Sequence, residues 1–134
     1  MATLPTSLDL ARLCADIAHE KKATDIAILD VSKIVVISSY FVLASGDSRK
    51  QLQAIVDAIQ ERVRGSGWRR RGLEGFDEGK WILSDYGAVV VHLFDRESRR
   101  FYDLESNWAD APRVAYTPPP VPAPASPAPA ANYL

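Results

Sequence analysis

Cysteine and histidine are scarce in this sequence, and their scarcity excludes several kinds of site. The only cysteine is Cys14, so no intramolecular disulfide can form. The only histidines are His19 and His92, and neither has a cysteine or a second histidine at the spacing of a zinc site. We therefore expect no metal and no cofactor, and we interpret Cys14 as a small buried hydrophobic residue rather than a reactive thiol.

Long apolar runs and an excess of one charge are also missing. No apolar run approaches the roughly 20 residues that a membrane-spanning helix needs, and Met1–Thr6 has neither a secretory nor a transit-peptide pattern. The formal net charge is -1, so no global basic field draws the chain onto nucleic acid. We expect a cytoplasmic protein without a membrane or DNA partner, in which any RNA contact is secondary and made by a local patch.

The length and composition fit one domain, with 47% apolar and 25% charged residues. Hydrophobic periodicity and β-branched or aromatic runs predict its elements. These are helices over about 8–22 and 48–64, strands over 25–31, 40–44 and 68–74, a hairpin over 79–94, and helical turns over 95–107 with Phe101, Leu104 and Trp108 as apolar anchors. This order predicts an α/β domain with a mixed β-sheet of about five strands and helices packed mainly on one face.

Capping residues support both long helices. Thr6 precedes the first helix and Asp9 follows three residues later, a weak form of the capping box. Asp47 or Ser48 is a suitable N-cap for the second helix. The second helix also carries one apolar stripe at helical spacing, formed by Leu52, Ile55, Val56, Ile59 and Val63.

The composition changes abruptly after Pro112. From Thr117 to Ala131 the chain is almost entirely proline, alanine, valine and serine. Such a segment cannot bury enough apolar surface to offset the entropy cost of ordering it. We expect one domain over residues 1–112 and a disordered, Pro/Ala-rich tail over residues 113–134.

The predicted hairpin suggests a docking surface. Trp81, Leu83 and Asp85 alternate along its first strand and therefore share one face of the sheet. Two long helices cover one sheet face well and the other only in part, so a partly uncovered face containing Trp81 is a candidate interface. The alternative is that Trp81 belongs to the core.

The turn Asp85-Tyr86-Gly87 joins the two strands, with a glycine able to take positive φ. We expect Tyr86 at its tip, where an amphipathic ring with few rotamers suits an interface. His92 stands alone in an apolar strand, which favours a core or interface residue over a catalyst.

Two further segments leave alternatives open. The turn from Ser45 to Ser48 precedes a helix and could cradle a phosphate, but the strand after that helix carries no acidic pair to hold two metals. Trp68-Arg69-Arg70-Arg71 could contact RNA, although arginines on an edge strand also protect the edge.

Several motifs together resemble the Iojap family, the bacterial ribosomal silencing factors. The resemblance covers roughly residues 8–112, and its order and spacing are specific. The matching pieces are Asp25 to Ser32, Ser38 to Arg49, Glu74-Gly75, Gly79 to Gly87, Val89 to His92, and Phe101 to Trp108.

The resemblance implies an α/β fold related to nucleotidyltransferases but without known transfer activity, so we expect no enzyme. It also implies binding to the fourteenth protein of the large ribosomal subunit, a block on subunit joining when nutrients are short, and possible homodimers. A nucleotidyltransferase-like enzyme using the Ser45–Ser48 turn is the alternative. Combined with the strand alternation, the resemblance assigns the contact to Trp81, Leu83, Asp85 and Tyr86, supported by Lys80 and His92.

Overall fold

The computed structural model describes residues 6–119. Its helices and strands follow the predicted order. They are α1 (Ser7–Glu20), β1 (Thr24–Asp30), β2 (Tyr40–Gly46), α2 (Arg49–Val63), β3 (Gly72–Glu74), β4 (Trp81–Asp85), β5 (Val89–Asp95), α3 (Arg96–Tyr102), α4 (Leu104–Asn107) and β6 (Arg113–Val114). Within this part of the chain, none of the helices combines the length and the apolar character needed to cross a bilayer.

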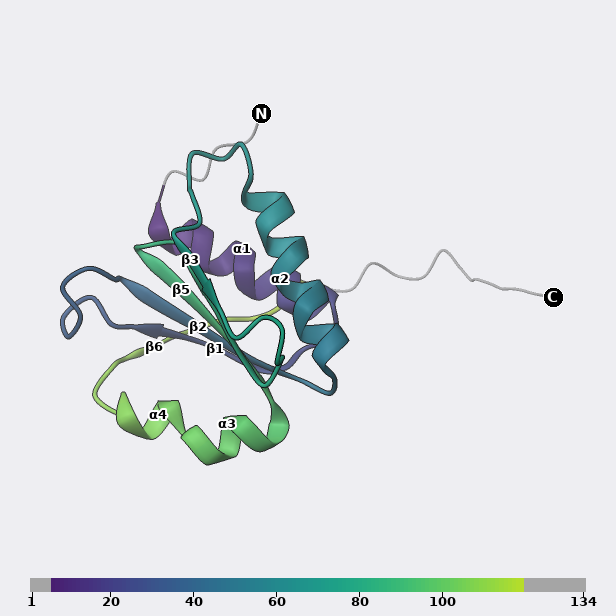
Figure 1. The fold of residues 1–134 in the computed structure, drawn as a ribbon. Coiled ribbons are helices and arrows are strands. Elements are labelled where there is room, and N and C mark those ends of the chain that lie inside the picture. The colour runs from purple at the N-terminus through teal and green to yellow at the C-terminus, as the bar shows by residue number, and fades with distance from the viewer. Residues whose placement is uncertain (1–5, 120–134) are drawn as a thin grey trace.

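The strands form one mixed sheet in the order β3-β4-β5-β2-β1-β6. The central pair, β2 and β5, is parallel, and the other pairs are antiparallel. Figure 1 shows α1 and α2 on one face of the sheet and the short α3 and α4 on the other. The mixed α/β prediction is confirmed, with six strands rather than about five.

The predicted caps are present at both long helices. The Thr6 hydroxyl accepts a hydrogen bond from the Asp9 amide at 3.1 Å. The Ser48 hydroxyl accepts one from the Gln51 amide at 3.0 Å. The five stripe residues of α2 are all buried, so this helix packs through the face that its sequence predicts.

The sheet separates two apolar clusters. The first lies under α1 and α2 and contains Cys14, Ile82 and Leu93. The second lies on the face of α3 and α4, where Phe41, Phe94 and Leu104 are buried and Trp81 and Leu83 are partly buried. Cys14 has no exposed surface, and burial raises the pKa of its thiol to about 12.

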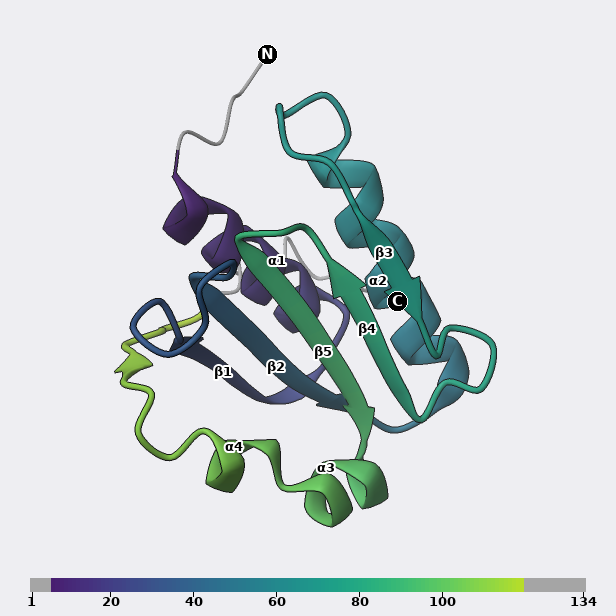
Figure 2. The same ribbon diagram turned by 60° about the vertical axis from the view of Figure 1, so that its left-hand side comes forward.

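Three details differ from the sequence-based expectations. The strand expected over 68–74 pairs only from Gly72 to Glu74, at the sheet edge nearest α2, as Figure 2 shows. Beyond Pro112, β6 pairs with β1, and the Tyr116 hydroxyl donates to the Asp16 carboxylate at 2.7 Å. Ordered structure therefore continues past the expected boundary. Of the expected tail, residues 120–134 lie outside the described part of the chain.

Candidate functional site

An exposed apolar surface lies where β4 meets α3. It is formed by Trp81, Leu83, Phe101 and Tyr102, which we call the aromatic patch. Trp81 and Leu83 are half-buried, whereas Phe101 is 78% exposed and Tyr102 is 45% exposed. The Tyr102 ring lies 4.6 Å from Trp81 and 5.0 Å from Phe101 between centroids. Contiguous exposed apolar side chains of this kind are typical of protein-docking surfaces.

The alternation of β4 produces this surface. Ile82 and Ser84 point toward α2 and are buried. The alternate residues Trp81, Leu83 and Asp85 point to the opposite face of the sheet and are half-buried. The helices on their side of the sheet have only 7 and 4 residues, so they cover that face incompletely. The expected placement of Trp81 and Leu83 on a partly covered face is confirmed.

His92 supports Trp81 from the neighbouring strand. Its ring is 4% exposed, and its Nδ1 accepts a hydrogen bond from the Trp81 indole nitrogen at 3.2 Å. The rings of Phe41 and Phe94 also lie beside it. Burial lowers the pKa of His92 to about 4, because these neighbours offer nothing to stabilise an imidazolium. The neutral ring therefore fixes the indole orientation, with Nε2 left without a hydrogen-bond partner among the described residues.

Tyr86 does not lie at an exposed tip. It is 2% exposed and packs in the cluster under α1 and α2, where its hydroxyl donates to Gln60 Oε1 at 2.9 Å. Burial raises the pKa of its phenol. The expectation was wrong because the alternation of β4 continues one residue into the turn, which places Tyr86 on the same side as Ile82 and Ser84.

The two remaining predicted residues border the patch face. Asp85 is half-buried, and its carboxylate accepts a hydrogen bond from the Gly87 amide at 2.7 Å. Gly87 has φ 84°, which a residue with a side chain rarely adopts. Lys80 is exposed just before β4, and its carbonyl accepts from the Asp95 amide at 3.0 Å. The structure thus gathers Trp81, Leu83, Asp85 and His92 on one face, with Lys80 at its rim.

Sequence reasoning missed the contribution of α3. Phe101 was expected to be a buried anchor, but the only buried residue of α3 is Ser98, and Phe101 points outward. Of the other two anchors, Leu104 is buried and Trp108 is half-buried. The signal available in the sequence was the adjacent pair Phe101-Tyr102 at the end of a helix too short to bury both rings.

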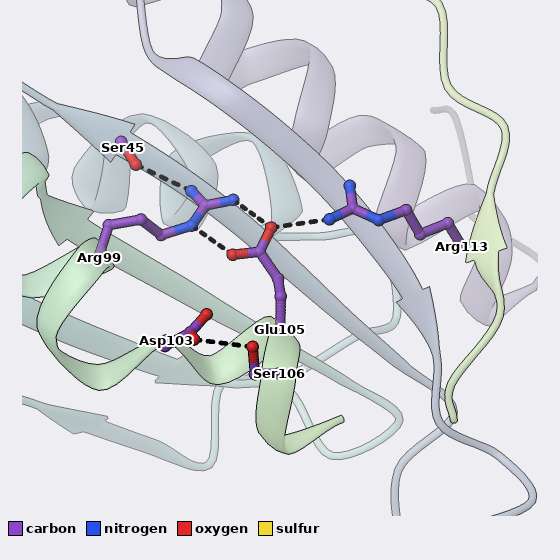
Figure 3. A network of polar contacts seen from close by, with 6 residues as sticks. All are labelled: Ser45, Arg99, Asp103, Glu105, Ser106 and Arg113. Atoms are coloured by element: carbon purple, nitrogen blue, oxygen red, sulfur yellow. Dashed lines mark hydrogen bonds and ion pairs between the residues drawn. The ribbon is translucent and has the colours of Figure 1, made fainter. Parts of the chain in front are cut away.

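A charged network holds α3 and α4 in place (Figure 3). Arg99 donates from Nε and Nη2 to the two carboxylate oxygens of Glu105, both at 2.9 Å, and from Nη1 to the Ser45 hydroxyl at 2.8 Å. Arg113 donates to the same carboxylate at 2.9 Å. The hydrogen bonds from Arg99 are the main reason that the pKa of Glu105 is lowered. The network ties the aromatic patch to β2 and β6.

Part of the Ser45–Ser48 turn is already committed to hydrogen bonds within the protein. The Asp47 backbone amide donates to Gln51 Oε1 at 2.6 Å, and the Gln51 backbone amide donates to the Ser48 hydroxyl. A methyl group at Gly46 would lie 2.8 Å from Leu52, so the turn is packed against its own helix. Over residues 6–119, no group of three or more histidine, cysteine or acidic side chains could hold a metal ion.

Comparison with known proteins supplies a family. The model of the family described as "Ribosomal silencing factor during starvation" matches residues 4–133. The chain belongs to this family. A Bacillus subtilis relative named ribosomal silencing factor RsfS is 40% identical over 103 residues, which span 77% of this chain and 87% of the relative.

A more distant relative and a solved structure are also similar to this chain. A Mus musculus protein named "Mitochondrial assembly of ribosomal large subunit protein 1" is 29% identical over 72% of this chain and 43% of its own length. A crystal structure of a Chromobacterium violaceum protein superposes with a TM-score of 0.74 at 32% identity and covers 78% of this chain and 87% of that one. The family is thus one of ribosomal silencing factors.

Proposed function

We propose that this protein is a cytoplasmic translational repressor that binds the large ribosomal subunit and blocks joining of the small subunit when nutrients are limiting. The contact is made with the fourteenth large-subunit protein, on the surface that meets the small subunit. The observation that carries the proposal is the aromatic patch, an apolar surface on a sheet face that two short helices cover only in part. The family description supports the ribosome as the target.

The patch fits a steric binder better than a catalyst. Aromatic side chains supply much of the binding energy in protein interfaces because they bury large areas with few rotamers to restrict. Trp81 is held by His92, and Tyr102 lies against Trp81, so these rings are already ordered before binding. A partner therefore gains contact area at a low cost in side-chain entropy.

Each predicted residue has a distinct role in this proposal. Trp81 and Leu83, joined by Phe101 and Tyr102, make the apolar contact. Asp85 meets a cation at the edge, since a ribosomal protein embedded in RNA is expected to be basic. Lys80 contributes at the rim, His92 positions Trp81, and the buried Tyr86 supports the turn from below rather than touching the partner. The proposed direct contacts are Lys80, Trp81, Leu83, Asp85, Phe101 and Tyr102.

Subunit joining on a sucrose gradient tests the proposal. Purified protein mixed with free large subunits should reduce the formation of joined ribosomes when small subunits are added. Ribosomes that are already joined should resist the protein, because their binding site is covered. Unchanged joining at saturating protein would reject the steric mechanism.

Two variants matched in exposure make this test specific. Phe101→Ala should weaken binding to large subunits by about fivefold or more, since truncating an aromatic side chain that anchors an interface costs over about 1 kcal/mol. Ile37→Ala removes an apolar side chain that is 79% exposed, close to the 78% of Phe101, but lies in the β1–β2 loop outside the patch. Ile37→Ala should bind like the parent chain, and an equal weakening in both variants would place the contact elsewhere.

A further inference from the structure

A second surface, distinct from the aromatic patch, is strongly basic. The segment from Glu61 to Arg71 contains five arginines and a single acidic residue, although the whole chain has a net charge of -1. The five are Arg62, Arg64, Arg69, Arg70 and Arg71, which we call the arginine cluster. Because the rest of the chain is acidic on balance, this segment carries a local excess of positive charge.

Most of the arginine cluster has no intramolecular charge partner. Arg70 is half-buried and the other four side chains are exposed. The one ion pair found for the cluster within residues 6–119 joins Arg64 to Glu61 at 3.5 Å, and exposed pairs of this kind contribute little. The remaining guanidinium groups have no acidic side chain within ion-pair distance in the described part of the chain.

The arginine cluster spans the end of α2 and the connection from α2 to β3. Arg62 lies in the last turn of α2 and Arg64 caps it, and the connection to β3 extends beyond the end of that helix in Figure 1 and Figure 2. Gly65 and Gly67, both with positive φ, reverse the chain. Trp68 then packs against the buried apolar residues under α1 and α2. This contact anchors the start of the segment that carries Arg69, Arg70 and Arg71.

Edge protection does not account for this arrangement. Arg62 and Arg64 belong to the end of α2 and are not at a strand edge. Arg69 and Arg70 precede the three paired residues of β3. Charges that protect an edge would lie on the unpaired side of the strand itself, so a different role is required for most of the cluster.

The chemistry of the cluster fits RNA phosphates. Its cations are all arginines, and a single planar guanidinium group can donate two hydrogen bonds to two oxygens of one phosphate. Its only aromatic residue, Trp68, packs against the apolar residues under α1 and α2, so arginines rather than the aromatic rings used for stacking on bases or for membrane insertion dominate this surface. These features favour contacts to the backbone of double-stranded RNA, which proteins recognise largely through phosphates and shape.

We propose that the arginine cluster binds the phosphate backbone of structured RNA without reading its sequence. The Arg71 amide donates to the Asp85 carbonyl at 2.6 Å, so the cluster borders the far end of the β4 face that carries the patch. A protein partner surrounded by RNA could thus occupy the patch while the cluster contacts neighbouring phosphates. The RNA contact itself does not depend on the proposed protein contact.

Anisotropy of a fluorescent RNA hairpin with a stem of about 20 base pairs tests this proposal on the full chain. The variant Arg62→Gln/Arg64→Gln/Arg69→Gln should bind about tenfold or more weakly at low salt. Its plot of log affinity against log salt should become shallower by roughly one unit for each phosphate that an arginine no longer neutralises. The matching Arg→Lys triple variant should recover part of the affinity.

The control variant Lys21→Gln/Lys33→Gln/Lys50→Gln removes the same charge from three other exposed positions. It should bind RNA nearly as the parent does, and an equal reduction there would overturn the proposal by showing a general charge effect. Absence of RNA binding by the parent chain would also overturn it, as would a preference for vesicles containing about one-quarter phosphatidylserine. Phe101→Ala should leave RNA binding unchanged, which separates failure of this proposal from failure of the protein contact.

Discussion

Protonation of His92 should destabilise the fold in mildly acidic solution. The ring is almost fully buried between Trp81, Phe41 and Phe94, and its pKa is lowered to about 4 from the ordinary value of 6.5. The unfolded chain therefore takes up a proton near pH 6.5, while the folded chain resists it until about pH 4. Because the unfolded state binds more protons across this window, the stability present above pH 6.5 is lost progressively as the pH falls toward 4.

The expected size of the effect follows from these two pKa values. Between pH 7.5 and pH 5, the free energy of unfolding should fall by about 2 kcal/mol. For a domain of this size, such a loss lowers the midpoint of thermal unfolding by on the order of 10 °C. The lowered pKa of Glu105 adds its own loss only as the pH falls below the ordinary carboxylate value of 4.5, so measurements above pH 5 isolate the histidine.

Urea unfolding at several pH values between 7.5 and 5 measures this dependence. His92→Gln keeps an amide oxygen that can accept from the Trp81 indole but cannot take up a proton in this range, so its stability should vary little with pH. His19→Gln removes the other histidine, on α1, and should retain the dependence of the parent chain. If His92→Gln loses stability with falling pH as steeply as the parent, the buried histidine is not the cause.

Other predictions concern the site and its supports. Trp81→Ala should weaken binding to large subunits by roughly thirtyfold, the effect of losing an interface anchor worth about 2 kcal/mol; an unfolded variant in a thermal melt would instead mark Trp81 as core. Glu105→Gln should lower stability by about 1–3 kcal/mol at pH 7, because Arg99 and Arg113 lose a charged acceptor; denaturant curves unchanged from the parent would contradict this. Deleting everything after Tyr116 should leave affinity within about threefold, roughly 0.6 kcal/mol, as a pull-down titration would measure. If homodimers form through the aromatic patch, added large subunits should convert dimer to monomer in sedimentation, whereas a dimer that binds subunits intact would refute a shared surface.

Local patterns in the sequence predicted most of the fold because local forces dominate those parts. The stripe and cap of α2 and the alternation of β4 each depend on neighbours a few residues away. The two-residue strand β6 depends instead on pairing with β1, which lies more than 80 residues earlier in the chain. The residues of β6 alone do not predict a strand. Contacts at long sequence separation are the part that periodicity does not encode.

The candidate site also combines residues that local patterns predict with residues whose positions depend on distant contacts. Strand alternation placed Trp81 and Leu83 on the partly covered face. The same alternation, carried one residue further, places Tyr86 in the core, but the turn signal at Asp85-Tyr86-Gly87 predicts that the alternation stops at Asp85. The outward direction of Phe101 and Tyr102 depends on how the charged network holds α3 against the sheet, which no single segment determines.

The burial of Cys14 gives this protein an internal reporter of opening. It is the only thiol in the chain, it has no exposed surface, and its raised pKa leaves almost no thiolate at neutral pH. An alkylating reagent can therefore react only when α1 separates from the sheet, either locally or as the whole domain unfolds. The rate of alkylation, followed by mass spectrometry, converts each substitution discussed above into a free energy of opening under native conditions.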